Sequence, residues 1–187
     1  MLYGNASTER SFAYLANASA ASTLPVRGGS SHATAPRNKL ARAITSKRGR
    51  AQMAPDEDQM RDFARSYANA WCSHDPARVA THYVPGGMIA INGGEPTEIT
   101  EAARAFMDAF PDIEVFMDDV AIKDDIVEFH WTFTGTNTGP GGTGTSVRIS
   151  GFEEWTLGAD GRVVESKGNY DSNEYDRQLE HGAPATS

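Results

Sequence analysis

A carboxylate stands on a strand face that is otherwise mostly apolar. In the stretch SVRISGFEEWTL, strict alternation places Glu153 on the same face as Val147, Ile149, Trp155 and Leu157. An unpaired buried charge costs several kcal/mol, roughly, so this carboxyl must be paired, neutral or lining a cavity. A carboxyl on a cavity wall, with its pKa raised by apolar surroundings, is suited to general acid/base chemistry.

Ordinary structural roles compete with this interpretation. Glu153 would be a rim carboxylate if it paired with Arg148 or Lys167, and a one-residue register slip would turn Glu154 inward in its place. Tyr67, the second candidate, belongs to an apolar stripe with helical spacing. Its hydroxyl would then either serve a substrate or be satisfied within an ordinary core.

The bulk composition excludes several classes of function. The chain has 187 residues, a formal charge of −8, one cysteine and five histidines. The charge argues against nucleic acid or an anionic membrane as the main partner, and no apolar run approaches the ~20 residues that span a bilayer. Cys72 alone makes no disulfide and fits a cytoplasmic location. The histidines lack metal-ligand spacing and no nucleotide-binding motif is present, so we expect no metal and no cofactor.

Charge divides the chain into two parts. Residues 1–54 hold eight basic groups and one acid, whereas residues 55–187 hold nine basic groups and 24 acids. The first part is rich in Ala, Ser, Thr and Gly and lacks periodicity, which predicts a disordered basic tail. Three explanations stay open for it: a transit peptide, a weak secretory signal, or a translation start placed too early.

Within residues 55–187 the hydrophobic period changes from 3.6 to 2. The spacing predicts helices over 55–75, 75–84 and 97–112, with Asp75 as a cap and Pro76 at the first helical position. GGMIAINGG, between the second and third helix, predicts a short strand bounded by glycines. Strands are then predicted over 113–122, 126–139, 146–157 and 162–171, followed by a short terminal helix. This order predicts an α+β domain with helices on one face of a curved antiparallel sheet.

Several strings, taken in order, resemble the nuclear transport factor 2-like superfamily, particularly its SnoaL-like polyketide cyclase branch. They are WCSHDPARVATHYVPGG, AFMDAFPDIEV, HWTFTGTNTG, SGFEEWTLGADGRVVE and the closing NYD with RQL. The resemblance implies a cone-shaped, barrel-like α+β domain over residues 55–187, in which a curved antiparallel sheet packs on three N-terminal helices and encloses an apolar pocket. Because proteins of this fold do many jobs, it constrains the fold more than the chemistry.

The resemblance also implies roles for two residues. SnoaL-like cyclases and ketosteroid isomerases carry an acid at the strand position of Glu153, and the isomerases carry an oxyanion tyrosine at the register of Tyr67. Carried over, Glu153 would act as the acid/base and Tyr67 would polarise a substrate oxygen. The expected activity is proton transfer next to a carbonyl of a small apolar substrate (enolisation, isomerisation or aldol cyclisation) without a cofactor.

Four departures from these relatives favour other hypotheses. The isomerase base falls at Ile91, and the Arg of epoxide hydrolase-like members falls at Gly151. The acid often found on the last strand of the superfamily falls at Gly168, and a frequent histidine is Asn137. These residues cannot take a proton. They favour a binding or dimerising module without catalysis as the alternative. An epoxide or ester hydrolase variant is a further alternative, which Gly151 disfavours.

The remaining assignments concern the pocket and the outside of the sheet. Six residues are expected to line the substrate pocket: Trp71, Asn92, Trp131, Phe133, Trp155 and Tyr170. His130 alternates away from its apolar neighbours, so we expect it on the outer sheet face, where this fold often forms dimers. The expected partners are thus a carbonyl-bearing small molecule and a second copy of the chain.

Overall fold

The computed structural model describes residues 56–184, so the predicted tail over 1–54 lies outside the described residues. Its helices are α2 (Glu57–Trp71), α3 (Pro76–Ala80), α4 (Ile99–Ala109) and α5 (Ser172–His181). The predicted start signals operate as expected. The side chain of Asp75 caps α3, Pro76 is its first residue, and the Asp56 side chain caps α2.

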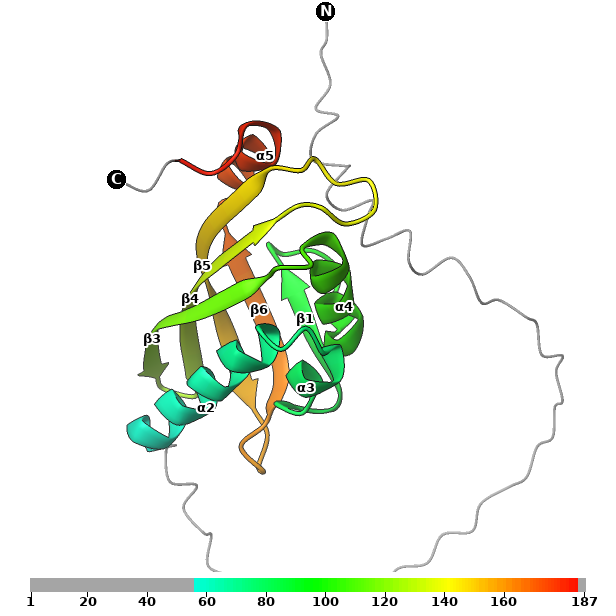
Figure 1. Ribbon diagram of the computed structural model, residues 1–187. Helices are drawn as coiled ribbons and strands as arrows, with labels where there is room; N and C mark the ends of the chain where they lie inside the picture. Colours follow the sequence, from blue (N-terminus) through cyan, green and yellow to red (C-terminus); the bar gives the residue numbers. More distant parts are fainter. Residues whose placement is uncertain (1–55, 185–187) are drawn as a thin grey trace, which may run out of the picture.

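Six strands form one sheet: β1 (Tyr83–Ile91), β2 (Thr97–Glu98), β3 (Glu114–Lys123), β4 (Ile126–Thr136), β5 (Ser146–Leu157) and β6 (Val163–Tyr170). Their order is β2-β1-β6-β5-β4-β3, so the curved sheet has two edges and does not close into a barrel. Helices α2, α3 and α4 lie on its concave side, while α5 lies at one end (Figure 1). The α+β class expected from the sequence is confirmed.

Two details of the sheet differ from the sequence expectation. β1 pairs with β6 in parallel, so the sheet is not antiparallel throughout. β1 also begins at Tyr83, five residues before the strand predicted between the glycines, so that Gly86 and Gly87 lie inside it. The register shifts between Tyr83 and Met88, and Gly86 has a φ of 75°, which an L side chain rarely adopts. This bulge keeps Tyr83 in the sheet and buried, 1% exposed.

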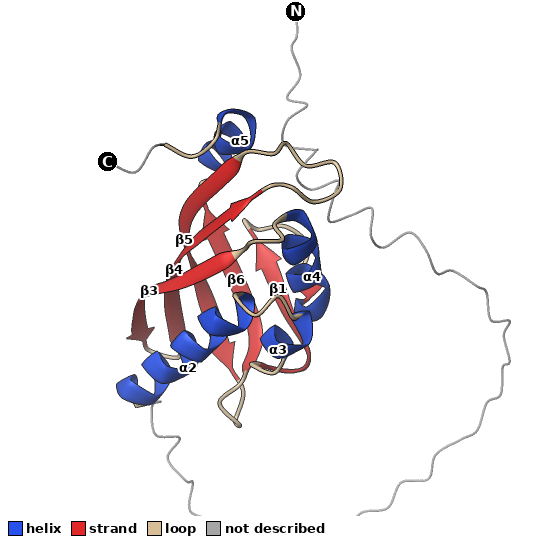
Figure 2. Cartoon of the chain, in the orientation of Figure 1, coloured by secondary structure: helices blue, strands red, loops and turns tan. Residues whose placement is uncertain are grey.

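The helices and the concave side of the sheet share the core (Figure 2). Alternation along β4 and β5 places Val127, Phe129, Phe133, Ile149 and Trp155 inward, all of them buried. Helix α2 contacts β3, and helices α3 and α4 contact each other and β1. The inward faces of β4, β5 and β6 are thereby available to form the wall of a cavity.

Candidate active site

A cavity of about 60 Å³ lies between the concave sheet face and the helices. Because one water needs about 10–15 Å³ of cavity volume, this cavity has room for a small molecule with a single ring. The wall is formed mainly by large apolar side chains, which include Trp71, Phe106, Ile113, Trp131, Phe133 and Ile149. Among the described residues that line it, Glu153 carries the only carboxyl group.

Glu153 is buried, with 6% of its surface exposed, and three side chains donate hydrogen bonds to it. The indole Nε1 of Trp155 lies 2.8 Å from Oε2, and the hydroxyl of Ser166 lies 2.7 Å from the same oxygen. The Tyr67 hydroxyl lies 3.3 Å from Oε2 and 3.4 Å from Oε1. Oε1 therefore has fewer and longer hydrogen bonds from the protein than Oε2 has, and is the oxygen more available to a ligand.

Burial raises the pKa of Glu153 above its usual range, although the hydrogen bonds from Trp155, Ser166 and Tyr67 lower it in part. No Lys, Arg or His among residues 56–184 forms an ion pair with this carboxyl. The rim pairing with Arg148 or Lys167 and the inward turn of Glu154 are thus not what the structure contains. The hydrogen-bond donors around the carboxyl stabilise its ionised form, whereas the apolar surroundings disfavour that form.

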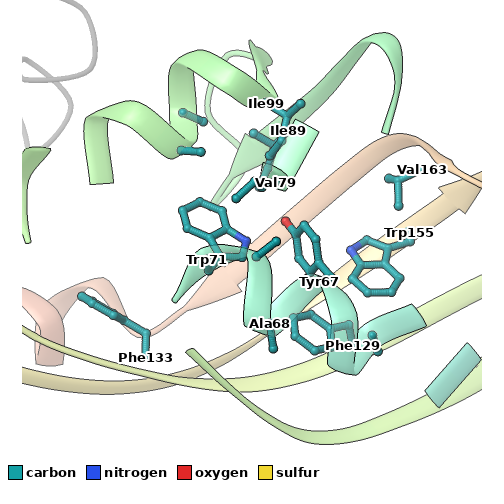
Figure 3. Packing of buried hydrophobic residues seen from close by; sticks show 14 of the residues in the cluster. Tyr67, Ala68, Trp71, Val79, Ile89, Ile99, Phe129, Phe133, Trp155 and Val163 are labelled. Atoms are coloured by element: carbon teal, nitrogen blue, oxygen red, sulfur yellow. The ribbon is translucent and has the colours of Figure 1, made fainter. Parts of the chain in front are cut away.

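Tyr67 is fully buried in the core, and its hydroxyl contacts the acid. The ring lies between Trp71 and Trp155 and is nearly perpendicular to both, as Figure 3 shows. Its hydroxyl is 3.2 Å from that of Tyr83. Burial and the adjacent Glu153 carboxyl raise the pKa of Tyr67 and of Tyr83 well above the usual value, so both phenols stay protonated. A protonated phenol holds a carboxylate in place by donating to it.

The raised pKa predicts how stability changes with pH. The Glu153 carboxyl ionises at a lower pH in the unfolded chain than in the folded one. Its contribution to the free energy of unfolding is therefore complete below the ordinary glutamate pKa and is lost as pH rises through the folded value. We expect Glu153→Gln to remove this loss, so that denaturant midpoints of wild type and variant diverge toward high pH in favour of the variant. Parallel curves from pH 4 to 8 would contradict this.

The other predicted pocket residues are distributed unevenly. Trp71, Trp131, Phe133 and Tyr170 line the cavity. Trp155 is fully buried behind Glu153, where its ring stacks on Phe129 at 4.9 Å. Asn92 lies in the turn after β1 with a φ of 49°, and its side-chain oxygen accepts a hydrogen bond from the backbone of Tyr170. The structure thus brings Glu153 and four of the six residues to one cavity, and gives Asn92 a turn-forming position.

Two residues of the acid's surroundings were not identified from the sequence. Ser166 pairs across the sheet with Trp155, diagonally to Glu153. A register shift between Thr156 and Leu157 means that counting back from the GADG turn does not give this pairing. Tyr83 reaches the cluster because β1 pairs with β6 in parallel. That pairing joins segments 80 residues apart, and no local pattern reports it.

Polar residues outside the cavity have structural partners. His130 lies on the outer sheet face as expected, 3.3 Å from Glu128. His82 contacts the hydroxyl of Ser66, and the Cys72 thiol contacts the backbone of Val115. Among residues 56–184 no cluster of His, Cys, Asp and Glu is arranged to hold a metal ion. None of the helices described is long and apolar enough to cross a membrane.

A sequence model of the SnoaL-like domain matches residues 64–166, more than half of the chain. The chain belongs to the SnoaL-like domain family. The match begins within α2 and ends in β6 at Ser166, so it includes Tyr67 and Glu153. No curated protein matches the sequence.

Several solved structures have the same fold as this SnoaL-like domain. AclR of Streptomyces galilaeus, a candidate hydroxylase, is 20% identical with a TM-score of 0.58, and the match covers 69% of this chain and all of AclR. A candidate SnoaL-like polyketide cyclase of Jannaschia sp. is 24% identical with a TM-score of 0.58, over 71% of this chain and 97% of its own. IdmH of Streptomyces antibioticus, a candidate polyketide cyclase, is 22% identical with a TM-score of 0.53, over 65% and 98%. At these identities the likeness establishes the fold.

Proposed function

We propose that this SnoaL-like domain is a cofactor-independent enzyme that transfers a proton next to a carbonyl group of a small apolar substrate. Enolisation, isomerisation and aldol cyclisation are the reactions of this kind. The observation that carries the proposal is a buried carboxyl, with no cation paired to it among the described residues, on the wall of an apolar cavity. Candidate polyketide cyclases among the structural neighbours are consistent with it.

The reaction follows from the two states available to Glu153. The ionised carboxyl takes a proton from the carbon beside the carbonyl, and the C–H electron pair forms a C=C bond while the carbonyl π pair moves to oxygen. The protonated carboxyl then returns the proton to another carbon, or to the oxygen of a second carbonyl that the enolate carbon has attacked. A carboxyl whose pKa is raised toward the working pH serves both steps.

Tyr67 has two possible parts in this proposal, and one substitution separates them. If its hydroxyl holds the Glu153 carboxyl, Tyr67→Phe removes a donor to the ionised form, so the acidic limb of the kcat/KM profile moves to higher pH and the maximal rate changes little. If it also polarises a substrate oxygen, the maximal rate falls about 10²-fold or more. We expect the first result, because Tyr67 is fully buried and does not line the cavity.

Deuterium exchange tests the function without knowledge of the natural substrate. Cyclohexanone is an apolar ketone small enough for the cavity, and its protons beside the carbonyl exchange with D₂O through the enol or enolate. We expect the full chain to accelerate the loss of these proton signals in NMR spectra above the rate in matched buffer. Exchange at the buffer rate, with cyclohexanone shown to bind, would leave a binding module as the function.

We further infer that the chain forms a homodimer through the outer face of β3, β4 and β5. Phe116, 46% exposed, and Phe152 lie on this face. The same face carries the Lys123–Glu128 ion pair, a mixed charge pattern that a second copy can complement. We expect sedimentation of a two-chain species, which Phe116→Lys converts to monomer. Val164 is an exposed apolar residue at the β5–β6 hairpin, 41% exposed. The control substitution Val164→Lys should leave the dimer intact.

A further inference from the structure

Trp131 carries a buried hydrogen-bond donor that has no acceptor. Its side chain lies on the cavity wall, yet its indole Nε1 is shielded from solvent and has no partner within residues 56–184. The other buried side-chain nitrogen and oxygen atoms in this part of the chain have partners. Trp155, on the same sheet face, donates its indole N–H to Glu153. An unsatisfied donor is unfavourable in a folded protein, so its retention on a cavity wall points to a ligand that completes it.

The strand register sets where the side chains of Trp131 and Glu153 leave the sheet. Across β4 and β5, Trp131 is opposite Gly151 and Phe129 is opposite Glu153. Trp131 and Glu153 are therefore two residues apart along the strands, or about 7 Å at ~3.4 Å per residue, and both face inward. The two side chains thus leave the sheet at separate places on the cavity wall.

Gly151 allows the indole of Trp131 to take this position. A Cβ atom on Gly151 would lie 2.7 Å from Cζ2 of Trp131 and 2.5 Å from a backbone oxygen of Asn169. Without a side chain there, the indole lies over β5 and approaches Tyr170 on the neighbouring strand, with ring centroids 6.4 Å apart. Tyr175 of α5 continues this row at 5.4 Å from Tyr170. Trp131, Tyr170 and Tyr175 all line the cavity, so this aromatic row is part of its wall.

We propose that the indole N–H of Trp131 binds a second oxygen of the substrate. The substrate is then a small cyclic molecule with two carbonyl oxygens on opposite sides of an apolar ring. One belongs to the carbonyl next to the carbon that Glu153 deprotonates, and the other accepts from Trp131. This inference rests on the proposed function for the first oxygen, and on Trp131 alone for the other. Trp131 binds and orients the substrate in this scheme and transfers no proton.

A matched pair of ketones tests the second contact. Cyclohexanone and 1,4-cyclohexanedione have the same ring, and only the dione has an oxygen on the far side. With the ¹⁵N-labelled full chain, we expect the dione to move the Trp131 indole N–H signal downfield and cyclohexanone to leave it nearly unchanged. We expect the dione to bind roughly 3- to 10-fold tighter, the worth of one net hydrogen bond. Trp131→Phe identifies the signal and should equalise the two affinities.

Glu153→Gln separates this inference from the proposed function. That variant should lose deuterium exchange with both ketones while keeping the preference for the dione, because the indole N–H is untouched. Absence of exchange in the wild type would therefore count against the proposed function alone. The role of Trp131 is overturned if the dione leaves its indole signal unmoved, if the wild type binds both ketones equally, or if the preference survives in Trp131→Phe.

Discussion

Replacing Glu153 by Gln is expected to reduce enzyme-catalysed exchange of cyclohexanone by about 10²- to 10⁴-fold, the usual contribution of a general acid/base. The amide has nearly the same shape, and its oxygen can still accept from Trp155 and Ser166, which are 2.8 and 2.7 Å from the carboxyl. It cannot take or return a proton. The rate is measured by NMR in D₂O, and the fold is checked by circular dichroism.

Glu154→Gln is the matched control for this experiment. Glu154 is the next residue of β5, faces the opposite side of the sheet and pairs in register with Glu128 and Lys167. The substitution makes the same chemical change 3.4 Å further along the strand, roughly, without altering the cavity. Equal losses in the two variants would show that charge on β5, and no group in the cavity, determines the rate.

The largest expected loss of stability follows Trp155→Ala. The indole is fully buried, stacks on Phe129 and packs edge-on against Phe63 and Tyr67. Removing such a side chain costs about 3–5 kcal/mol. The lost N–H donor leaves the Glu153 carboxyl short of a partner, which adds about 1–3 kcal/mol. Because a domain is stable by only about 5–15 kcal/mol, the variant should be close to unfolded at room temperature.

Trp155→Phe distinguishes packing from hydrogen bonding in this loss. Phenylalanine keeps an aromatic ring against Phe129 but cannot donate to Glu153. We expect an intermediate midpoint of urea unfolding, together with a further rise in the pKa of the acid because a donor to its ionised form is gone. A Trp155→Ala variant with a midpoint close to that of the wild type would mean that the aromatic cluster is not central to the core.

The sequence predicts the helices and strands of this fold better than the contacts between them. Alternation along β5 correctly turns Glu153 inward, and helical spacing correctly turns Tyr67 toward the core, because each is a periodic property of one segment. Asp75 and Pro76 begin their helix as expected, since capping is also local. The bulge at Gly86 and the parallel pairing of β1 with β6 depend on contacts distant in sequence, so neither follows from a local pattern.

The same distinction applies to the site. Ser166 and Tyr83 surround the acid only after the β5–β6 hairpin and β1 have come together, so their residue types alone gave no signal. Asn92 is polar and adjacent to the position of the isomerase base, but its left-handed backbone places it in a turn. Trp131 was expected on the wall. That its N–H lacks an acceptor depends on every neighbouring atom and could not be inferred from spacing.

Two glycines on the concave face, Gly151 and Gly168, differ in how much space a side chain would have there. At Gly151 a Cβ atom would lie 2.5 Å from the backbone oxygen of Asn169, so the fold requires glycine at that position. At Gly168, directly opposite Glu153, a methyl group would meet its nearest neighbours, Cγ of Glu153 and Cγ1 of Ile91, at 3.8 Å, an ordinary separation. A Gly168→Ala substitution would therefore reduce the cavity beside Glu153 without disturbing the sheet. Substrate size can diverge among descendants of this protein while the scaffold stays the same.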